Sequence, residues 1–349
     1  MSNKKNILIM AGGTGGHIFP ALAIANELKK RSVNVEWLGS TIGMEKNIIP
    51  KHLIRLHRVT AVGLRGKNIV KLIKAPFMLS LAMLQTFKVF LTVKPDLVIG
   101  MGGYVSGIGG IVAWLFRVPL IIHEQNAIPG TTNLILSKIA NQTLQAFDNT
   151  FDAKTKAVSC GNPIHFKVID KSPTNKPLNL LILGGSLGAK SINEAIPFLQ
   201  TDLNIWHQTG ERHYEHVKSL YAKSNSRTNE PLIEPFIDDM AQAYAWSDIV
   251  ICRSGAMTVS ELIATNSIGI LVPFPYAIDD HQTANAKILT EQGAAILLPE
   301  EELSSNKLDK VIGKIKIKDI TSCIKLINDI DSATLITDYI LMPNLSNSS

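Results

Sequence analysis

Twice in this chain, a short and mainly apolar run ends in a glycine-rich segment that leads directly into a helical pattern. The first run covers residues 6–11 and precedes Gly-Gly-Thr-Gly-Gly-His at 12–17. The second covers residues 178–183 and precedes Gly-Gly-Ser-Leu-Gly at 184–188. An apolar run without polar alternation is typical of a strand buried on both faces, as in a parallel sheet. The feature predicts two units that each open with strand, glycine loop and helix.

The rest of the chain continues both patterns. Alternating strand-like and helical segments predict an α/β fold with two doubly wound, Rossmann-like parallel sheets. Helices are expected at 18–31 and 189–199, and further strands at 33–38, 97–99, 120–122, 141–146, 205–208, 249–252 and 268–272. Ligands of such sheets bind at the carboxyl ends of the strands, so we expect two units that hold a substrate in the cleft between them.

The alternation pauses at Gly161-Asn162-Pro163 and in the polar stretch 170–176. A length of 349 residues also favours two domains over one. We therefore place an N-terminal domain at residues 1–162 and a C-terminal domain at residues 163–349. The last helical stretch, residues 332–341, is a candidate to pack back on the N-terminal domain.

Charge is divided unevenly between the two halves. Residues 1–165 hold 19 lysines and arginines against 7 acidic residues, whereas the remaining residues hold 16 against 22. A basic half indicates an anionic partner, which could be nucleic acid, an anionic membrane surface or a phosphorylated substrate; a merely solvated surface is the alternative. Three scattered cysteines and an N-terminal apolar run too short for a signal peptide predict a reducing, cytosolic compartment.

One stretch, residues 75–93, requires a test for membrane insertion. Gln85 and Lys88 interrupt a span that is barely long enough to cross a bilayer, which argues against a transmembrane helix. Apolar residues beside Lys67, Lys71 and Lys74 are typical of a helix that lies in the interface of an anionic membrane. A helix buried against the first domain fits the same spacing, and both interpretations stay open.

The glycine loops do not fit two common nucleotide sites. Isoleucine stands at position 18 where a dinucleotide-binding loop needs its third glycine, and the acidic partner could only be Glu36, inside a strand. In GGSLGAKS at 184–191, Ala189 replaces the last glycine of a phosphate-binding loop, and no acidic residue ends a neighbouring strand. Glycines before a helix still favour anion binding, because the backbone can approach closely and free N–H groups point at the ligand.

Six segments, taken in order, resemble the MurG family, the UDP-N-acetylglucosamine (UDP-GlcNAc) transferases of peptidoglycan synthesis. They are GGTGGH (12–17), MGGYVSG (101–107), HEQN (123–126), GGSLGA (184–189), EPFIDDM (234–240) and CRSGAMTVSE (252–261). The resemblance runs from residue 7 to about residue 334. It implies a GT-B fold and a peripheral protein on the cytoplasmic face of the bacterial inner membrane, with other cell-wall synthesis proteins as candidate partners.

The resemblance also implies an inverting transfer. The sugar GlcNAc would move from UDP-GlcNAc to the 4-hydroxyl of the N-acetylmuramyl-pentapeptide in lipid I, an undecaprenyl-diphosphate conjugate, to give lipid II. His17 matches the general base of the reaction, and the pKa of histidine suits proton transfer near neutral pH. The alternative role for His17 is to orient the acceptor or its diphosphate.

Further site residues follow from the same match. In the first domain, His123 and Glu124 would hold the loop or the acceptor, and the positions that match contacts to the donor sugar or acceptor diphosphate are Thr14, Gly15, Gly16 and Asn126. In the second domain, Glu261 would accept hydrogen bonds from the ribose. The remaining matches there are a phosphate contact at Ser186, a uracil contact at Ile237, the helix start Ala256, Met257, Thr258, Val259 and Ser260, and a sugar contact at Gln282.

His165 departs from the family, which often has arginine shortly after the Asn-Pro at 162–163. The donor contact expected there is weaker or pH-sensitive, or passes to Lys167. The acidic and histidine residues at 211–216 are interpreted as surface, and the resemblance implies neither a metal nor a cofactor for catalysis. No nucleic-acid partner is expected.

Two other functions remain as alternatives. One is a UDP-GlcNAc 2-epimerase-like enzyme, against which HEQN and MGGYVSG argue. The other is a nucleotide-binding or nucleotide-hydrolysing protein on a similar scaffold, against which Ala189 and the missing acidic strand end argue.

Overall fold

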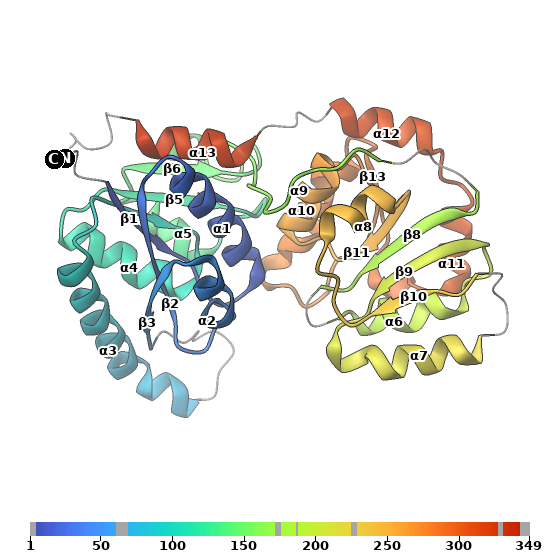
Figure 1. Cartoon of the computed structure of the whole chain (residues 1–349), viewed down its shortest axis with the longest axis horizontal. Coiled ribbons are helices and arrows are strands. Elements are labelled where there is room, and N and C mark those ends of the chain that lie inside the picture. The colour runs from blue at the N-terminus through green and yellow to red at the C-terminus, as the bar shows by residue number, and fades with distance from the viewer. Residues whose placement is uncertain are drawn as a thin grey trace. The chain divides into compact units, whose positions relative to one another are not determined.

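The computed structural model describes residues 5–60, 69–171, 176–185, 188–224, 229–326 and 331–342. The chain forms two compact units (Figure 1). Unit 1 contains residues 1–165 and 330–349, and unit 2 contains residues 166–329. The sequence placed the change of domain at 162/163, whereas the contacts place it between His165 and Phe166 and return the last helix to unit 1.

Unit 1 is built on a parallel sheet of seven strands, in the order β3-β2-β1-β4-β5-β6-β7. The strands are β1 (Asn6–Met10), β2 (Asn34–Ser40), β3 (Arg55–Val59), β4 (Leu97–Gly100), β5 (Leu120–Glu124), β6 (Gln142–Gln145) and β7 (Val158–Ser159). The doubly wound parallel fold predicted from the sequence is confirmed. The two edge strands were not predicted, because β3 reads Arg-Leu-His-Arg-Val and β7 has only two residues.

The two faces of this sheet carry different helices. Ile7 and Ile9 of β1 face a core shared with α1 (Gly15–Lys30) and α13 (Ser332–Leu341), whereas Leu8 and Met10 face a core shared with α3 (Ile69–Val93) and α4 (Gly103–Leu115). The short helices α2 (Glu45–Ile48) and α5 (Thr131–Leu136) complete the unit. Because both faces are covered, the central strands β1, β4 and β5 read as largely apolar runs.

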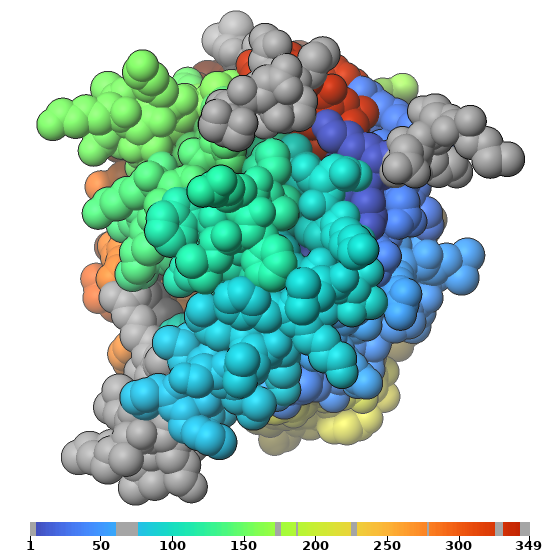
Figure 2. Space-filling model, turned by 90° about the vertical axis from the view of Figure 1, so that its left-hand side faces the viewer, coloured from blue at the N-terminus to red at the C-terminus, as the bar shows by residue number. Residues whose placement is uncertain are grey.

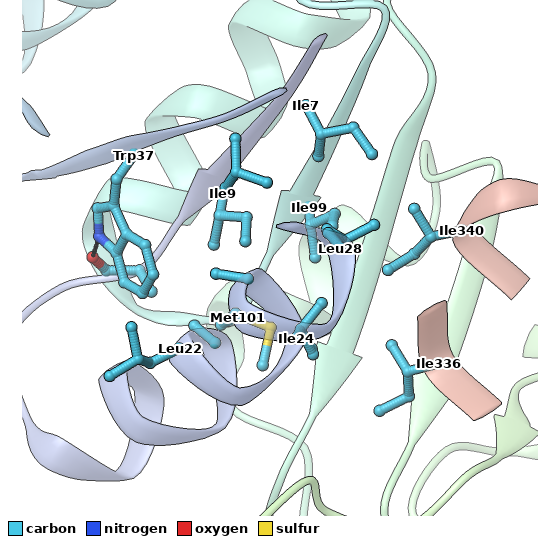
Figure 3. Close-up of a cluster of buried hydrophobic side chains, with 14 of the residues drawn as sticks. Ile7, Ile9, Leu22, Ile24, Leu28, Trp37, Ile99, Met101, Ile336 and Ile340 are labelled. Carbon is cyan, nitrogen blue, oxygen red and sulfur yellow. Dashed lines mark hydrogen bonds between the residues drawn. The ribbon is translucent and has the colours of Figure 1, made fainter. Parts of the chain in front are cut away.

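The C-terminal helix α13 is part of the unit 1 core. Ile336 and Ile340 are 0% exposed and point toward Ile24, Leu28 and Ile99 (Figure 3). On its outer side, Asp338 forms an ion pair with Arg31 at the end of α1. The chain therefore returns, after the whole of unit 2, to close the core with which it began.

Unit 2 repeats the arrangement with six parallel strands in the order β10-β9-β8-β11-β12-β13. Its strands are β8 (Leu178–Leu183), β9 (Leu203–Gln208), β10 (Leu232–Glu234), β11 (Ile249–Cys252), β12 (Ile268–Leu271) and β13 (Ala295–Leu297). Its helices are α6 (Lys190–Ala195), α7 (Tyr214–Lys223), α8 (Met240–Trp246), α9 (Ala256–Ala264), α10 (His281–Thr290), α11 (Ser305–Ile312) and α12 (Ile317–Leu326).

The helix expected at 189–199 is shorter than predicted. The α-helix ends at Ala195, and a 3-10 turn follows over Ile196–Phe198. Pro197 lies in that turn, and proline supplies no N–H for an α-helical hydrogen bond. The edge strands β10 and β13 were also missed, since each has only three residues.

Helix α3 lies at the surface of unit 1. Ala82, Thr86 and Phe90 are buried, whereas Phe77 is 76% and Leu84 68% exposed. By length and composition alone, Pro76–Val93 is long and apolar enough to cross a membrane, and core helices of soluble proteins pass the same test. One side of the helix packs on the core of unit 1, and only 22% of this span is buried, so a large apolar part of its surface stays exposed.

Candidate functional site

In unit 1, the strand order reverses between β1 and β4, and glycine segments follow both strands. Gly13, Gly102 and Gly103 have φ angles of +94°, +92° and +74°. Residues other than glycine rarely adopt this backbone conformation. His17, in the first turn of α1, lies against the second segment, because a Cβ atom at Gly102 would be 3.2 Å from its Nε2. The fold thus brings the proposed base and two glycine segments to the edge where ligands of such sheets bind.

A buried carboxylate that the sequence analysis missed shapes this edge. Glu45 is 0% exposed, and its Oε2 accepts the Gly13 N–H at 3.1 Å. Its Oε1 accepts the N–H and the Oγ–H of Ser40 at 2.6 and 2.7 Å. Glycines make room for it, since a Cβ would lie 2.7, 2.6 and 2.0 Å from its side chain at Gly12, Gly39 and Gly43. The glycines beside Glu45 were the signal that could have identified it.

A second buried carboxylate, Glu124, organises the loop after β5. It is 2% exposed. Its Oε1 accepts the backbone N–H and the Nδ2–H of Asn126, both at 3.0 Å, and its Oε2 accepts Gly130 N–H at 3.0 Å and Asn133 Nδ2–H at 2.8 Å. These bonds favour the first of the two roles that the sequence left open for Glu124, which is to hold the loop that carries Asn126.

His123, also fully buried, anchors the end of unit 1. Its Nε2 lies 2.9 Å from the Gly161 carbonyl oxygen, and its Nδ1 lies 3.0 Å from the Gln125 amide nitrogen. A carbonyl only accepts, so the proton is on Nε2. Burial lowers the pKa of His123, which keeps the ring neutral in this network.

In unit 2, the equivalent reversal lies between β8 and β11. The loop after β8 needs its glycines, because a Cβ would lie 2.6 Å from Ala189 N at Gly184 and 2.2 Å from Thr209 O at Gly188. Ser186, the predicted phosphate contact, lies outside the described residues. The backbone is therefore closely packed at Gly184 and Gly188, where only glycine fits.

Gln208, at the end of β9, links this loop to the predicted base-binding segment. Its Nε2 donates to Gly185 O at 3.2 Å, and its Oε1 accepts the Ile237 N–H at 3.3 Å. Gln208 lies outside the six sequence motifs and was not predicted as a site residue. Ile237 is only 2% exposed, which leaves little of its side chain for a uracil ring to contact.

Helix α9 begins directly after β11. Of the residues predicted to face the donor, Met257 and Thr258 are half-buried, whereas Val259 is 0% exposed and can contribute only its backbone. Ser254, just before the helix, is 0% exposed, and its Oγ has no hydrogen-bond partner among the described residues. Buried hydroxyls are normally hydrogen-bonded, so this one is a candidate to bond a ligand oxygen beside the helix N-terminus.

Glu261 lies in the second half of α9. It is 8% exposed, and its Oε2 accepts the hydroxyl of Tyr244 on α8 at 2.9 Å. Burial raises the pKa of Glu261 to about 7, and the hydrogen bond from Tyr244 acts in the opposite direction. Ser260, its neighbour, is 9% exposed.

Arg253 and Gln282 hold the loop after β12. The Arg253 guanidinium donates to Val272 O and Pro273 O at 3.2 Å and forms an ion pair with Glu300. The Oε1 of Gln282 accepts the Phe274 N–H at 2.9 Å. The side-chain carbonyl oxygen of Gln282 is therefore hydrogen-bonded to the loop. A contact to the sugar would have to come from the rest of this side chain.

His165, the last residue of unit 1, stacks on Phe19 of α1 with ring centroids 4.8 Å apart. The imidazole remains exposed, but the covered ring face is partly desolvated, and this lowers its pKa. Stacking holds His165 against α1, whatever donor contact it makes. Lys167, the alternative for that contact, is exposed.

Within the described ranges, no group of three or more His, Cys, Asp or Glu side chains could hold a metal ion. Glu211, Glu215 and His216 are exposed on the surface of unit 2. Burial raises the pKa of the Cys160 thiol to about 12 and also raises that of Cys252, so neither is a reactive thiolate.

Both halves of the chain match one glycosyltransferase family. Residues 7–145 match the glycosyltransferase family 28 N-terminal domain, and residues 179–321 match the glycosyltransferase family 28 C-terminal domain. A UDP-N-acetylglucosamine--N-acetylmuramyl-(pentapeptide) pyrophosphoryl-undecaprenol N-acetylglucosamine transferase of Vesicomyosocius okutanii subsp. Calyptogena okutanii is 57% identical over 98% of this chain and 99% of its own length.

Solved structures agree with this match. The crystal structure of Acinetobacter baumannii MurG superposes with a TM-score of 0.79 and 36% identity, over 96% of this chain and 99% of the other. A putative UDP-N-acetylglucosamine 2-epimerase from Listeria monocytogenes has a TM-score of 0.66 at 15% identity, over 97% of this chain and 96% of the other, which indicates a shared fold only. The chain therefore belongs to glycosyltransferase family 28 and, within it, to the MurG family.

Proposed function

We propose that this chain transfers GlcNAc from UDP-GlcNAc to lipid I, giving lipid II for peptidoglycan synthesis. The observation that carries the proposal is the 57% identity, over 98% of the chain, with a relative that bears the name of this transferase. The two glycine-bordered sheet edges supply one anion site in each unit, as a transfer between two diphosphate-linked substrates needs.

In unit 1, His17 is the proposed general base. It takes the proton from the acceptor hydroxyl as that oxygen attacks the anomeric carbon of GlcNAc, and attack opposite to the leaving UDP inverts the configuration. Thr14 and Gly16 are exposed at the start of α1, where backbone N–H groups and the helix dipole favour the acceptor diphosphate. Asn126, held by Glu124, is the proposed contact to the donor sugar.

In unit 2, the start of α9 is the proposed site of the donor diphosphate. Negative charge develops on UDP as it leaves, and the helix N-terminus stabilises that charge. The buried Ser254 hydroxyl and the partly exposed Met257 and Thr258 lie at this end of the helix. Glu261 is the proposed acceptor of hydrogen bonds from the ribose.

An anionic membrane surface is the proposed partner of unit 1. Helices α3, α4 and α5 form one outer face of the unit, and they follow one another across Figure 2. Large apolar side chains are exposed on this face: Phe77, Leu84 and Leu91 on α3, Trp114 and Leu115 on α4, and Leu134 and Ile135 on α5. Large apolar side chains exposed on three adjoining helices are typical of an interaction site.

Basic residues accompany these apolar side chains. Lys88, Lys94, Arg117 and Lys138 are exposed. Only two acidic residues, Asp96 and Glu124, lie between positions 76 and 140, and Glu124 is buried. Apolar area with surrounding positive charge supports binding to the interface of an anionic leaflet rather than insertion across it. We propose peripheral binding at the cytoplasmic face of the inner membrane, where lipid I would be met.

One assay separates the candidate functions. The purified protein is given UDP-GlcNAc labelled in the sugar, with and without a lipid I analogue. Label in a lipid product, formed only with the acceptor, is expected. Label in a free 2-epimer would indicate the epimerase, and release of UDP at the same rate without acceptor would indicate a hydrolase; either outcome overturns the proposal.

A further inference from the structure

Tyr244 is a buried titratable residue with no assigned part in the proposed reaction. It is 0% exposed, and its hydroxyl donates to Glu261 Oε2 at 2.9 Å. The two residues lie on different helices, α8 and α9, seventeen positions apart. The contact is therefore formed by tertiary packing rather than by helical periodicity.

The hydrogen bond fixes one of the two carboxylate oxygens. Tyr244 donates to Oε2 and not to Oε1, which leaves Oε1 for hydroxyl groups of a ligand. An ionised carboxylate that is 8% exposed loses most of its hydration, so each hydrogen bond to the charged form matters. The fixed Tyr244 hydroxyl both lowers this cost and restricts the rotation of the Glu261 side chain.

The ring of Tyr244 is itself held in place. Phe166, the first residue of unit 2, stacks on it with ring centroids 5.9 Å apart and an interplanar angle of 21°. The hydroxyl end is fixed by Glu261 and the ring by Phe166. Tyr244 therefore has the rigid support that positions a ligand-binding side chain in a preformed site.

We propose that Tyr244 is a positioning residue for donor recognition, which holds the Glu261 carboxylate with its second oxygen turned to the ribose hydroxyls of UDP. The inference rests on the proposed function, because Glu261 has its ribose role from that assignment. Tyr244 does not touch the reacting atoms. Its loss should weaken binding of the nucleotide while leaving the chemical step intact.

The geometry has a consequence for pH. The titratable groups that face Glu261 are Tyr244 on α8 and Cys252 on β11, and burial raises the pKa of both, so both stay neutral. The ribose hydroxyls donate to the ionised carboxylate, so UDP binds more weakly as pH falls below about 7, the pKa of Glu261. The Tyr244 hydroxyl lowers that pKa, so its removal shifts the loss of binding to higher pH.

The test uses Tyr244→Phe, which removes one oxygen and keeps the ring that packs on Phe166. The dissociation constant of UDP is measured by calorimetry between pH 6 and 9, together with KM for UDP-GlcNAc and kcat. We expect the dissociation constant and KM at pH 7.5 to rise about tenfold, with kcat at saturating donor within about threefold. The pH below which binding weakens should rise by up to about one unit.

Tyr221→Phe is the matched control. Tyr221 is also buried in unit 2, and its hydroxyl lies 2.9 Å from His207, away from Glu261. This variant should lose a similar amount of stability with no change in the dissociation constant of UDP or in its pH dependence. A general effect of removing a buried hydroxyl would appear in both variants, and that result would overturn the proposal.

A double-mutant cycle keeps the test decisive if Tyr244→Phe is unstable. If Tyr244 acts through Glu261, Tyr244→Phe should have no further effect on UDP binding in a Glu261→Gln background. Equal effects in both backgrounds would contradict the proposal. Two results together would refute the role of Tyr244 and leave the proposed function standing. They are transfer of GlcNAc to lipid I by the wild-type protein, and unchanged UDP binding and pH dependence in Tyr244→Phe. Wild-type protein without transfer would refute the proposed function instead.

Discussion

At the scale of single residues, buried carboxylates shape the candidate site in unit 1. Glu45 and Glu124 are both almost fully buried, and each accepts several N–H or O–H donors from the loops that follow the strands. Burying a charge without such donors costs several kcal/mol, so the loops and the carboxylates depend on each other. The glycines that the sequence marks as an anion site take their conformation partly from a residue outside the motif.

We predict that Glu45→Gln disturbs the Gly12–His17 loop. An amide NH₂ would face either the Gly13 N–H or the Ser40 donors, and two donors repel each other. The free energy of unfolding should fall by about 1–3 kcal/mol and kcat should fall, while the dissociation constant of UDP stays unchanged. Glu36→Gln, which removes the carboxylate paired with His57, is the control that should leave kcat unchanged. Equal kcat for both variants would contradict the prediction.

His17→Ala tests the proposed base. A general base contributes about 10²–10⁴-fold to a rate, so kcat should fall by at least about a hundredfold. The dissociation constant of UDP should not change, because the proposed UDP site lies in unit 2. His52→Ala, a half-buried histidine of unit 1 in a 3-10 turn, is the control. Turnover of His17→Ala within a few-fold of wild type would remove the assignment.

Glu261 should make stability depend on pH. Its pKa is raised by burial to about 7 from a model-peptide value of 4.5, so the folded state binds the proton more tightly than the unfolded state. The free energy of unfolding should therefore decrease as pH rises from about 4.5 to about 7, by about 3 kcal/mol. Urea unfolding of wild type and Glu261→Gln at pH 5 and pH 8 measures this; the variant should lack the decrease and bind UDP more weakly. A similar decrease in the free energy of unfolding of both proteins would show that groups other than Glu261 cause it.

At the scale of elements, helices with similar apolar content have different surroundings. Helix α13 buries Ile336 and Ile340 in the core of unit 1, whereas α3 buries one side and leaves Phe77, Leu84 and Leu91 exposed. Both show helical spacing of apolar residues, which indicates an apolar face but does not identify what covers it. For α3, the sequence left two alternatives open for this reason.

We predict that the exposed face of α3 and α4 binds anionic vesicles. Leu84→Glu and Trp114→Glu place a carboxylate where apolar area would enter the interface, so each should lower the partition coefficient about tenfold or more. Sedimentation with phosphatidylglycerol and phosphatidylcholine vesicles measures this, with UDP binding as the check of folding. Leu53→Glu, at a residue 89% exposed outside these helices, is the control. Undiminished binding of both variants would show that another surface is used.

At the scale of the whole molecule, each unit has its own sheet and its own core, and the chain crosses between them twice. A ligand that binds one unit should stabilise that unit and leave the other unchanged. UDP at a hundred times its dissociation constant stabilises its site by about 2.7 kcal/mol, equivalent to about a hundredfold slower exchange for amides that exchange by unfolding.

We predict that hydrogen exchange in the presence of UDP separates α13 from its sequence neighbours. Amides of α11 in unit 2 should gain protection, whereas those of α13, twenty residues further on, should keep their rates together with α1. Mass spectrometry of peptides from the three helices measures this. Protection of α13 in step with α11 would mean that the helix unfolds with unit 2, contrary to its packing.

Local patterns in the sequence determined the two parallel α/β units, the glycine loops after β1 and β8, and the family. These features rest on adjacent residues, because burial on both faces of a strand and the left-handed conformation of glycine are local properties. The edge strands β3, β7, β10 and β13 lacked such a pattern, being short or charged. Only the tertiary structure decided that Glu45 holds Gly13, that Tyr244 meets Glu261, and that α13 closes the first core. Those contacts join residues 17 to several hundred positions apart, and their partners are set by how the chain packs, not by any spacing along it.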